Sequence, residues 1–410
     1  MKKASIISVG NELLAGLIVN TNVVYLSRQL LSMGVPTVSS YTVGDRIDSI
    51  AQAMAQAAQQ ADIILITGGL GPTDDDLTRQ ALARFMGVQL EFKDYLLAEI
   101  SDFFTKRNIK MAQNNKVQAY IPAGAEALPN NVGTAPGIIV EREGKIFVCL
   151  PGVPSEMKQI FIESVAGRLK QAGGGQVVLM RKLRCFGTGE SVIAEKLGNL
   201  MQRDRNPLIN CTVSGGIITL HIVATATDKP CAEEMIGNDA RQLRALLGDL
   251  VYGRDEQTLA EVVGAKLRRR RKKLAVAESC TGGLIGKLLT DVPGSSDYFT
   301  YGWVTYCNEA KIRELGVDAG LIEKHGSVSE KVVRAMAKGA RARAGTDFAI
   351  AVTGIAGPGG GTEQKPVGLV YIAVDSGESI DVQRCVFSHT REHIRYRAAL
   401  AAINMLRLSL

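Results

Sequence analysis

The sequence has no long apolar run. No stretch of about 18 consecutive apolar residues occurs among its 410 residues, so we expect no membrane-spanning helix. The N-terminal Met1-Lys2-Lys3 leads directly into Ala4 to Val9, which is typical of a first strand and unlike a signal peptide. These two absences predict a cytoplasmic protein that does not associate with membranes.

Paired cysteines and aromatic clusters are also missing. The seven cysteines are odd in number, are scattered, and include no Cys-x-x-Cys pair, which predicts reduced thiols and neither a disulfide framework nor a zinc site. Six of the +7 net charges fall in the run Arg268 to Lys273, and 7 − 6 leaves +1 for the rest. The run ends a helical pattern, where cations complement the helix dipole, and no aromatic side chains are interleaved with it. We therefore do not expect nucleic-acid binding.

The order of strand-like and helical patterns predicts an α/β fold. The length suggests two or three domains, and we expect two α/β domains with parallel sheets, at residues 1–165 and 251–410. A small α/β connector domain is expected between them, at 166–250. It contains Gly187-Thr188-Gly189, which we interpret as a turn and helix cap.

Two glycine-containing loops follow the first and third strands expected in the N-terminal domain, at 10–16 and 67–78. Ligands of parallel sheets gather at the carboxyl ends of strands, so these loops are candidates for a binding site. The second loop offers backbone N–H groups for a phosphate together with threonine hydroxyls. The candidate phosphate-binding residues are Gly68, Gly69, Gly71, Thr73 and Thr78.

The same loop carries three consecutive carboxylates, Asp74 to Asp76. Carboxylates beside a phosphate-binding loop suit a divalent cation that bridges ligand and protein, and we expect Asp75, Asp76 and Glu12 to hold it. The metal identity is open. The alternative is that the acids only favour the N-terminus of the following helix.

In the C-terminal domain, the stretch Ala277 to Gly283 has the pattern strand, tight turn, helix. A hydroxyl on such a turn stands at a helix N-terminus, where free N–H groups of Thr281, Gly282 and Gly283 can stabilise an oxyanion. Ser279 is the candidate nucleophile, with Cys280 beside it. The alternative is that Ser279 only caps the helix.

A serine nucleophile needs a base, and Lys311 lies 311 − 279 = 32 residues further along. That spacing fits a strand, crossover helix and next strand, so both side chains reach the same sheet edge. A lysine serves as base if its pKa is lowered, and Tyr306 is placed to relay or orient the proton. Thr353 and Gly354 open a glycine-rich loop suited to phosphate contact or closure. Of the four histidines, His325 is the rival base.

These loops resemble a known family. The N-terminal loops, with those at 130–137 and 150–157, resemble the molybdopterin-binding-protein-like domain of the CinA family, although Asn11 stands where that family has aspartate. The motifs around Ser279, Tyr306 with Lys311, 326–329 and 353–358 are similar to its nicotinamide-nucleotide amidohydrolase domain. The resemblance covers nearly the whole chain.

The resemblance implies a hydrolase of pyridine-nucleotide recycling. It implies that the C-terminal domain converts nicotinamide mononucleotide (NMN) to nicotinic acid mononucleotide and ammonia, with serine as nucleophile, lysine as base and no cofactor. For the N-terminal domain it implies a metal-dependent ADP-ribose pyrophosphatase. We also expect a homo-oligomer, in the simplest case a dimer.

Two alternatives stay open. The N-terminal domain can instead be a non-catalytic binding module for a pterin-like or nucleotide effector. The protein can also be an accessory factor in competence or DNA damage that touches DNA through the basic run at 268–273.

Overall fold

The computed structural model describes residues 2–172 and 175–410, which form two compact units. The first unit contains residues up to 179 together with 224–234, and the second contains 180–223 and 235–410. Most of the expected connector therefore belongs to the same unit as the C-terminal domain.

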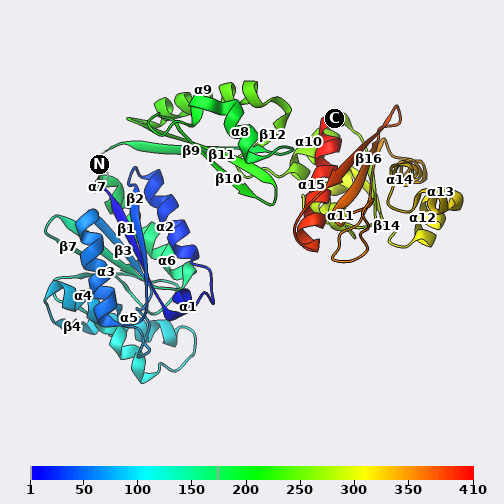
Figure 1. Ribbon diagram of the computed structural model, residues 1–410. Coiled ribbons are helices and arrows are strands. Elements are labelled where there is room, and N and C mark those ends of the chain that lie inside the picture. Colours follow the sequence, from blue (N-terminus) through cyan, green and yellow to red (C-terminus); the bar gives the residue numbers. More distant parts are fainter. Residues whose placement is uncertain (1, 173–174) are drawn as a thin grey trace. The chain divides into compact units, whose positions relative to one another are not determined.

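The N-terminal domain is a six-stranded sheet of order β2-β1-β3-β8-β7-β6 with helices on both faces (Figure 1). Its sheet strands are β1 (Ala4–Val9), β2 (Thr37–Val43), β3 (Ile63–Thr67), β6 (Glu126–Leu128), β7 (Gly137–Arg142) and β8 (Lys145–Leu150). Its helices are α1 (Asn11–Leu14), α2 (Thr21–Ser32), α3 (Ile47–Gln60), α4 (Thr78–Met86), α5 (Asp94–Thr105), α6 (Pro154–Ile160) and α7 (Ala166–Ala172). A separate ribbon pairs β4 (Leu90–Phe92) with β5 (Tyr120–Pro122).

The central strands of this sheet are apolar because both faces are covered. β1 and β3 are buried along their whole length. Ile7 and Ile64 pack on one face with residues of α3 and α4, while Ile6 and Leu65 pack on the other with residues of α2 and α6. The carboxyl ends of β1, β3 and β8 thus open at one edge, where the loops after them begin.

The expected α/β fold is confirmed, and the sheet of this domain is mostly parallel. β2, β1, β3 and β8 run parallel, but β7 is antiparallel to both β8 and β6. The reason is the two-residue loop Glu143-Gly144, in which both residues have positive φ. A loop this short makes a hairpin and leaves no room for a crossover.

The connector is a four-stranded sheet of order β10-β11-β9-β12 with two helices. Its elements are β9 (Val177–Cys185), α8 (Glu190–Leu197), β10 (Leu208–Ser214), β11 (Ile217–Ala226), α9 (Lys229–Leu247) and β12 (Val251–Arg254). β12 pairs with β9, so the connector extends to residue 254 and not 250. The first domain likewise extends past 165, because Leu169 of α7 is fully buried in its core.

The C-terminal domain has a five-stranded sheet of order β14-β13-β15-β16-β17. Its strands are β13 (Leu274–Glu278), β14 (Phe299–Val304), β15 (Phe348–Gly354), β16 (Leu369–Asp375) and β17 (Ile380–Val386). Its helices are α10 (Leu259–Arg270), α11 (Leu284–Thr290), α12 (Asn308–Leu315), α13 (Ala319–His325), α14 (Glu330–Ala344) and α15 (Arg391–Ser409). β14, β13 and β15 are parallel, whereas β16 and β17 are antiparallel additions at one edge.

Helices cover both faces of this sheet as well (Figure 1). α14 packs on small side chains such as Ala349 and Ala351, and α10, α11 and α15 pack on the opposite face with Val276 and Ile350. This layering places the carboxyl ends of the three parallel strands at one open edge.

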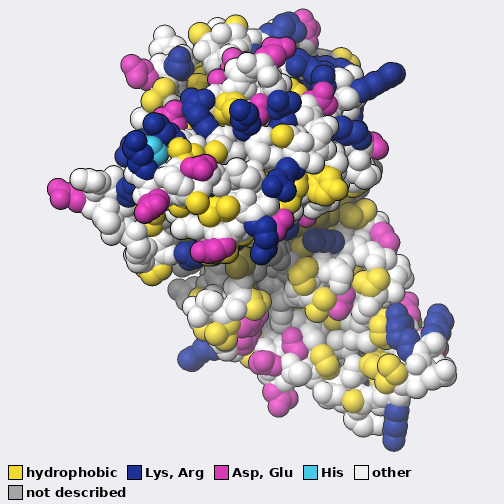
Figure 2. Space-filling view, turned by 90° about the vertical axis from the view of Figure 1, so that its right-hand side faces the viewer, with side chains coloured by type: hydrophobic (Ala, Val, Ile, Leu, Met, Phe, Trp, Pro, Cys, Tyr) yellow, Lys and Arg dark blue, Asp and Glu magenta, His cyan; other side chains and the backbone are white. Residues whose placement is uncertain are grey.

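The surface carries mixed charge. Lys and Arg side chains are spread across the face shown in Figure 2, with acidic side chains and small apolar areas between them. Within residues 2–172 and 175–410, no helix is long and apolar enough to cross a membrane.

Candidate active sites

The three parallel strands of the C-terminal sheet bring the expected catalytic residues together. Ser279 directly follows β13, and its N–H donates to Val352 O of β15 at 3.0 Å. On the other side, the N–H of Thr305 after β14 donates to Glu278 O at 2.8 Å. The turn that carries Ser279 is thus fixed to both neighbouring strands.

Lys311 of α12 reaches Ser279 from the end of β14. Its Nζ lies 3.2 Å from Ser279 Oγ and contacts three carbonyl oxygens, Thr305 O at 2.8 Å, Tyr306 O at 3.2 Å and Cys307 O at 3.4 Å. The side chain is only 1% exposed. Burial lowers the pKa of Lys311, against a smaller opposing effect of nearby groups that include Glu309.

Only a neutral amine can act as a base toward Ser279. A neutral lysine has two N–H donors and one lone pair. In that form the lone pair can accept the hydroxyl proton of Ser279, and the two donors serve two of the three carbonyl oxygens around Nζ. The arrangement is therefore that of a serine nucleophile beside its base.

Cys280 does not compete as the nucleophile in this structure. It is 5% exposed and packs in the hydrophobic core, and burial raises the pKa of its thiol to about 12. The thiolate that would react is therefore scarce. Arg395 of α15 fixes the turn by donating to Cys280 O at 3.2 Å and Thr281 O at 2.7 Å.

Two of the amides expected to stabilise an oxyanion have other partners. Gly282 N–H donates to Ser279 O at 3.0 Å, and Gly283 N–H donates to the Glu278 carboxylate at 3.0 Å. The N–H groups of Cys280 and Thr281 have no hydrogen-bond partner within the part of the chain that the structure describes. The oxyanion role expected of Gly282 and Gly283 therefore does not fit this geometry, and the amides of Cys280 and Thr281 are the ones available.

Glu278 organises the turn and was not anticipated from the sequence. Its buried carboxylate accepts from the N–H groups of Gly283, Ile285 and Gly286 at 3.0, 3.1 and 2.8 Å. It therefore satisfies the amides at the start of α11 that would otherwise lack partners in the interior. The sequence did carry a signal for this role, because Glu278 is an acid at the end of an apolar strand, just ahead of the turn that leads into a helix.

Tyr306 contacts Lys311 through its backbone and not through its phenol. Its hydroxyl accepts from Arg391 at 2.8 Å, while its carbonyl accepts from the lysine. The phenol lines the cavity in front of Ser279. Its position fits substrate contact better than the proton relay expected from the sequence.

Thr353 and Gly354 shape the same cavity from the end of β15. The hydroxyl of Thr353 donates to Ser327 O at 2.8 Å, which joins the loops at 326–329 and 353–361. A Cβ at Gly354 would lie 2.8 Å from Leu369 O, so a side chain does not fit there.

The cavity in front of Ser279 has a volume of about 440 Å³ and a basic lining. Lys365 and Arg391 line it together with Lys311, and no acidic side chain is found among its described lining residues. Lys365 is held by His325 O and Arg391 by Gly357 O. Neither cation was anticipated, and together they provide a site for an anionic group.

His325 is not positioned as the base. Its carbonyl accepts from Lys365, and the histidine is absent from the lining of the cavity. Desolvation and the nearby lysines lower its pKa.

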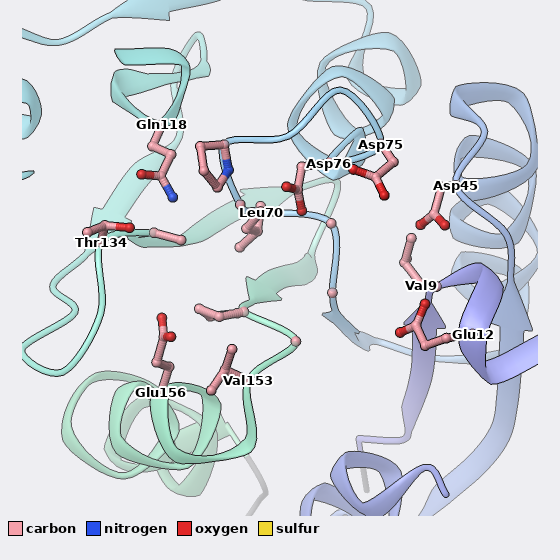
Figure 3. Close-up of a pocket in the computed structure, with 18 residues that line it drawn as sticks. Val9, Glu12, Asp45, Leu70, Asp75, Asp76, Gln118, Thr134, Val153 and Glu156 are labelled. Carbon is pink, nitrogen blue, oxygen red and sulfur yellow. The ribbon is translucent and has the colours of Figure 1, made fainter. Parts of the chain in front are cut away.

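The N-terminal domain has its own cavity, of about 400 Å³, at the carboxyl ends of β1, β3 and β8 (Figure 3). Carboxylates dominate its lining, and no Lys, Arg or His belongs to it among the described residues. The acids are Glu12, Asp45, Asp75, Asp76 and Glu156. Glu156 lies across the cavity from Glu12 and Asp45 (Figure 3).

The loop after β3 exposes amides to this cavity. Gly68 and Gly69 have positive φ, and a Cβ at Gly68 would lie 2.3 Å from Val9 O. The N–H groups of Gly69, Leu70 and Gly71 have no partner in the described residues, as a phosphate-binding nest requires.

Two threonines expected to bind phosphate hold the loop instead. Thr78 donates to Gly68 O at 2.7 Å, and Thr73 donates to the carboxylates of Asp75 and Asp76. The buried Arg79, also unanticipated, donates to the carbonyls of Leu70 and Gly71.

The expected metal ligands line this cavity but do not form a compact cluster. Among the described residues, no group of three or more His, Cys, Asp or Glu side chains is close enough to hold a metal ion. Asn11 does not line the cavity. Its N–H donates to Asp45 at 2.9 Å, so the departure from the family pattern lies beside the site and not in it.

Comparison with known proteins places the whole chain in one family. Residues 256–410 match the CinA C-terminal domain, 5–171 a probable molybdopterin binding domain, and 180–253 the damage-inducible protein CinA KH domain. A putative competence-damage inducible protein of Moorella thermoacetica is 41% identical over 409 residues, covering 100% of this chain and 99% of that protein. The chain belongs to the CinA family.

Two further similar proteins are a full-length relative and a solved structure of part of the chain's length. A CinA-like protein of Synechocystis is 44% identical over 409 residues, with 98% of each chain covered. A crystal structure of the protein CinA with unknown function from Thermoplasma acidophilum is 35% identical and covers 41% of this chain and 98% of that chain, with a TM-score of 0.39.

The CinA relatives have names that connect them with competence and damage, but in this chain residues of the basic run at 268–273, which precedes β13, make local contacts. Lys272 pairs with Asp347 at 2.8 Å, and Lys273 donates to Asp297 O at 2.8 Å. Arg271 is the left-handed C-cap of α10. These contacts match the interpretation of the run as a helix end.

Proposed function

We propose that the C-terminal domain deamidates NMN with Ser279 as nucleophile and Lys311 as base. The observation that supports this most strongly is the 3.2 Å contact between Ser279 Oγ and the buried Nζ of Lys311. In the proposed reaction, the amine takes the hydroxyl proton as Oγ bonds to the carboxamide carbon. The C–N bond then breaks, ammonia leaves with a proton returned by Lys311, and an ester on Ser279 remains.

Hydrolysis of this ester completes the cycle. Water attacks the ester carbon, Lys311 accepts one of its protons, and that proton returns to Ser279 as nicotinic acid mononucleotide is released. The amides of Cys280 and Thr281 stabilise the oxyanion in both steps. No cofactor is required.

The basic lining supports a phosphorylated substrate. We expect Lys365→Met and Arg391→Met each to raise KM for NMN about tenfold, because each removes a charge-assisted contact to the phosphate. Steady-state ammonia release with NMN, and with nicotinamide riboside as a substrate that lacks the phosphate, measures this effect. If the substitutions raise KM for the riboside by the same factor, these residues only support the loops and do not bind phosphate.

For the N-terminal domain we propose metal-dependent hydrolysis of a nucleotide pyrophosphate such as ADP-ribose. Five carboxylates and no cationic side chain are found among the described residues that line its cavity, so a phosphorylated ligand would be repelled unless a metal cation intervenes. Asp75 and Asp76, with Glu12, would hold a hard cation such as Mg²⁺, which often takes only one or two carboxylates plus substrate phosphates. When bound, such a cation neutralises phosphate charge and activates water.

Asp76→Asn should lower ADP-ribose hydrolysis by about 100-fold, an effect typical of a weakened metal site. Asp74→Asn is the matched control, because Asp74 is exposed and does not line the cavity. Release of AMP is measured across a panel of divalent metals. Undiminished turnover in excess chelator would contradict the proposal.

A second candidate function for this domain is a binding module for a pterin-like or nucleotide effector. The lack of a compact three-ligand cluster among the described residues favours it. Absence of turnover with every metal, together with saturable binding of ADP-ribose by calorimetry, would establish this second function.

A further inference from the structure

A separate cavity of about 300 Å³ lies in the second unit, between the connector and the C-terminal domain. On the connector side it is lined by the turn Gly187-Thr188-Gly189 and by residues of β10 and β11. On the other side it is lined by residues of β17, the segment after it, and α15. It shares no lining residue with the cavity in front of Ser279.

Arg397 of α15 is the cation in the lining of this cavity among the described residues. Its Nε is buried and has no hydrogen-bond partner in the described part of the chain, and its guanidinium carbon lies 5.6 Å from the ring centre of Phe387. Gly216 of the connector makes room for Nε, because a Cβ there would lie 2.4 Å from it. A partly buried guanidinium with an unpaired N–H group favours an anionic ligand.

Asn404 lies about two helical turns after Arg397 on α15 and offers a second donor. Its side chain is 8% exposed, and its Oδ1 accepts from Arg407 Nε at 2.9 Å. This contact orients the amide so that Nδ2 faces Gly187. A Cβ placed on Gly187 would lie 3.9 Å from Nδ2. Nδ2 has no hydrogen-bond partner in the described residues, although the side chain is more than nine-tenths buried.

The remaining lining residues suit a small organic molecule that carries an anionic group. The N-terminus of α8 has no side-chain cap, so its first amides are additional donors. Glu190 is the one acid among the described lining residues, and it hydrogen bonds with Cys211. Burial and the contact with Glu190 both raise the pKa of the Cys211 thiol. Phe186 and Ile218 supply apolar surface.

We propose that this cavity binds the phosphate group of a small phosphorylated metabolite. The guanidinium of Arg397, the amide of Asn404 and the first amides of α8 come from separate elements around the cavity, and a phosphate offers enough oxygen atoms to accept from several of them. The proposal does not rest on the deamidase. α15 also carries Arg395, which holds the turn of Ser279, so one helix connects the two sites.

Cysteine labelling of the full-length protein tests this directly. Cys385 lines the cavity, while Cys231 is exposed elsewhere and serves as the internal reference. The protein is alkylated in increasing inorganic phosphate, with chloride at matched ionic strength as the control, and each cysteine is quantified by mass spectrometry. Phosphate should slow the labelling of Cys385 saturably and leave that of Cys231 unchanged.

Variants assign the effect to the cavity. Arg397→Met should weaken the apparent affinity for phosphate about tenfold, since a charge-assisted contact is lost, and Asn404→Ala should also weaken it. Arg384→Met is the matched control, because Arg384 lies on the same strand as Cys385 but outside the lining. Unchanged labelling of Cys385 at every phosphate concentration, equal slowing of Cys385 and Cys231, or full protection in Arg397→Met would each overturn the proposal.

Discussion

Replacing Ser279 by alanine should lower ammonia release from NMN by at least about 10⁴-fold, the order of loss seen when a catalytic nucleophile is removed. The physical reason is that, among the described residues, Ser279 is the one whose hydroxyl or thiol lies within hydrogen-bond distance of the buried amine of Lys311. The neighbouring thiol belongs to the hydrophobic core, and its pKa is raised to about 12.

Cys280→Ala provides the comparison. It removes the neighbouring thiol and leaves the Ser279 hydroxyl in place, so most of the activity should remain. An inactive Cys280→Ala enzyme beside an active Ser279→Ala enzyme would show that the thiol is the nucleophile. Ammonia is measured with both variants at the same protein concentration, after circular dichroism has shown that both are folded.

Replacing Lys311 by methionine should lower the deamidase rate by about 10³-fold, a typical contribution of a general base. Methionine keeps much of the length of the buried side chain but cannot accept a proton. ADP-ribose hydrolysis, if the N-terminal domain performs it, should be unchanged and serves as the control for folding.

The pH dependence follows from the same residue. Burial lowers the pKa of Lys311 from the usual lysine value, and only the neutral amine accepts the proton of Ser279. As pH falls through the lowered pKa, Lys311 becomes protonated, so kcat/KM should fall on the acid side and level off above it. His325→Ala should keep a rate near that of the wild type. Loss of activity in His325→Ala, with activity kept in Lys311→Met, would contradict the lysine assignment.

The two cavities have opposite electrostatic character. This difference explains why we expect the N-terminal site, and not the C-terminal one, to need a metal cation. Lys365 and Arg391 can meet a phosphate directly in the C-terminal cavity. The carboxylates of the N-terminal cavity cannot do so without a cation. Under the proposed functions, the two sites would neutralise the charge of a phosphorylated ligand in different ways.

The meeting of Ser279 and Lys311 was predictable from sequence, because neighbouring parallel strands end at one edge and the spacing of these residues fits one crossover. The contribution of Lys365 and Arg391 was not predictable. Each is a single cation in a polar stretch, and they line one cavity only after the loop at 353–361 and the start of α15 have been placed.

The hydrogen-bond partners of the turn amides were a second feature that could not be predicted from the sequence. A sequence shows that Gly282 and Gly283 permit a turn, but it does not show that their amides are taken by Ser279 O and by the carboxylate of Glu278. The antiparallel strand β7 is different, because Glu143-Gly144 between two apolar runs was a readable hairpin signal.

The most direct test of the Ser279 and Lys311 mechanism is to trap the covalent intermediate. The enzyme is mixed with NMN, quenched in acid within its first turnovers, and digested, and the peptide that contains residues 279 and 280 is sequenced by tandem mass spectrometry. The mechanism predicts the mass of the acyl mononucleotide on Ser279, with the same adduct in Cys280→Ala and none in Ser279→Ala. An adduct on Cys280, or on Lys311 with Ser279 unmodified, would contradict it.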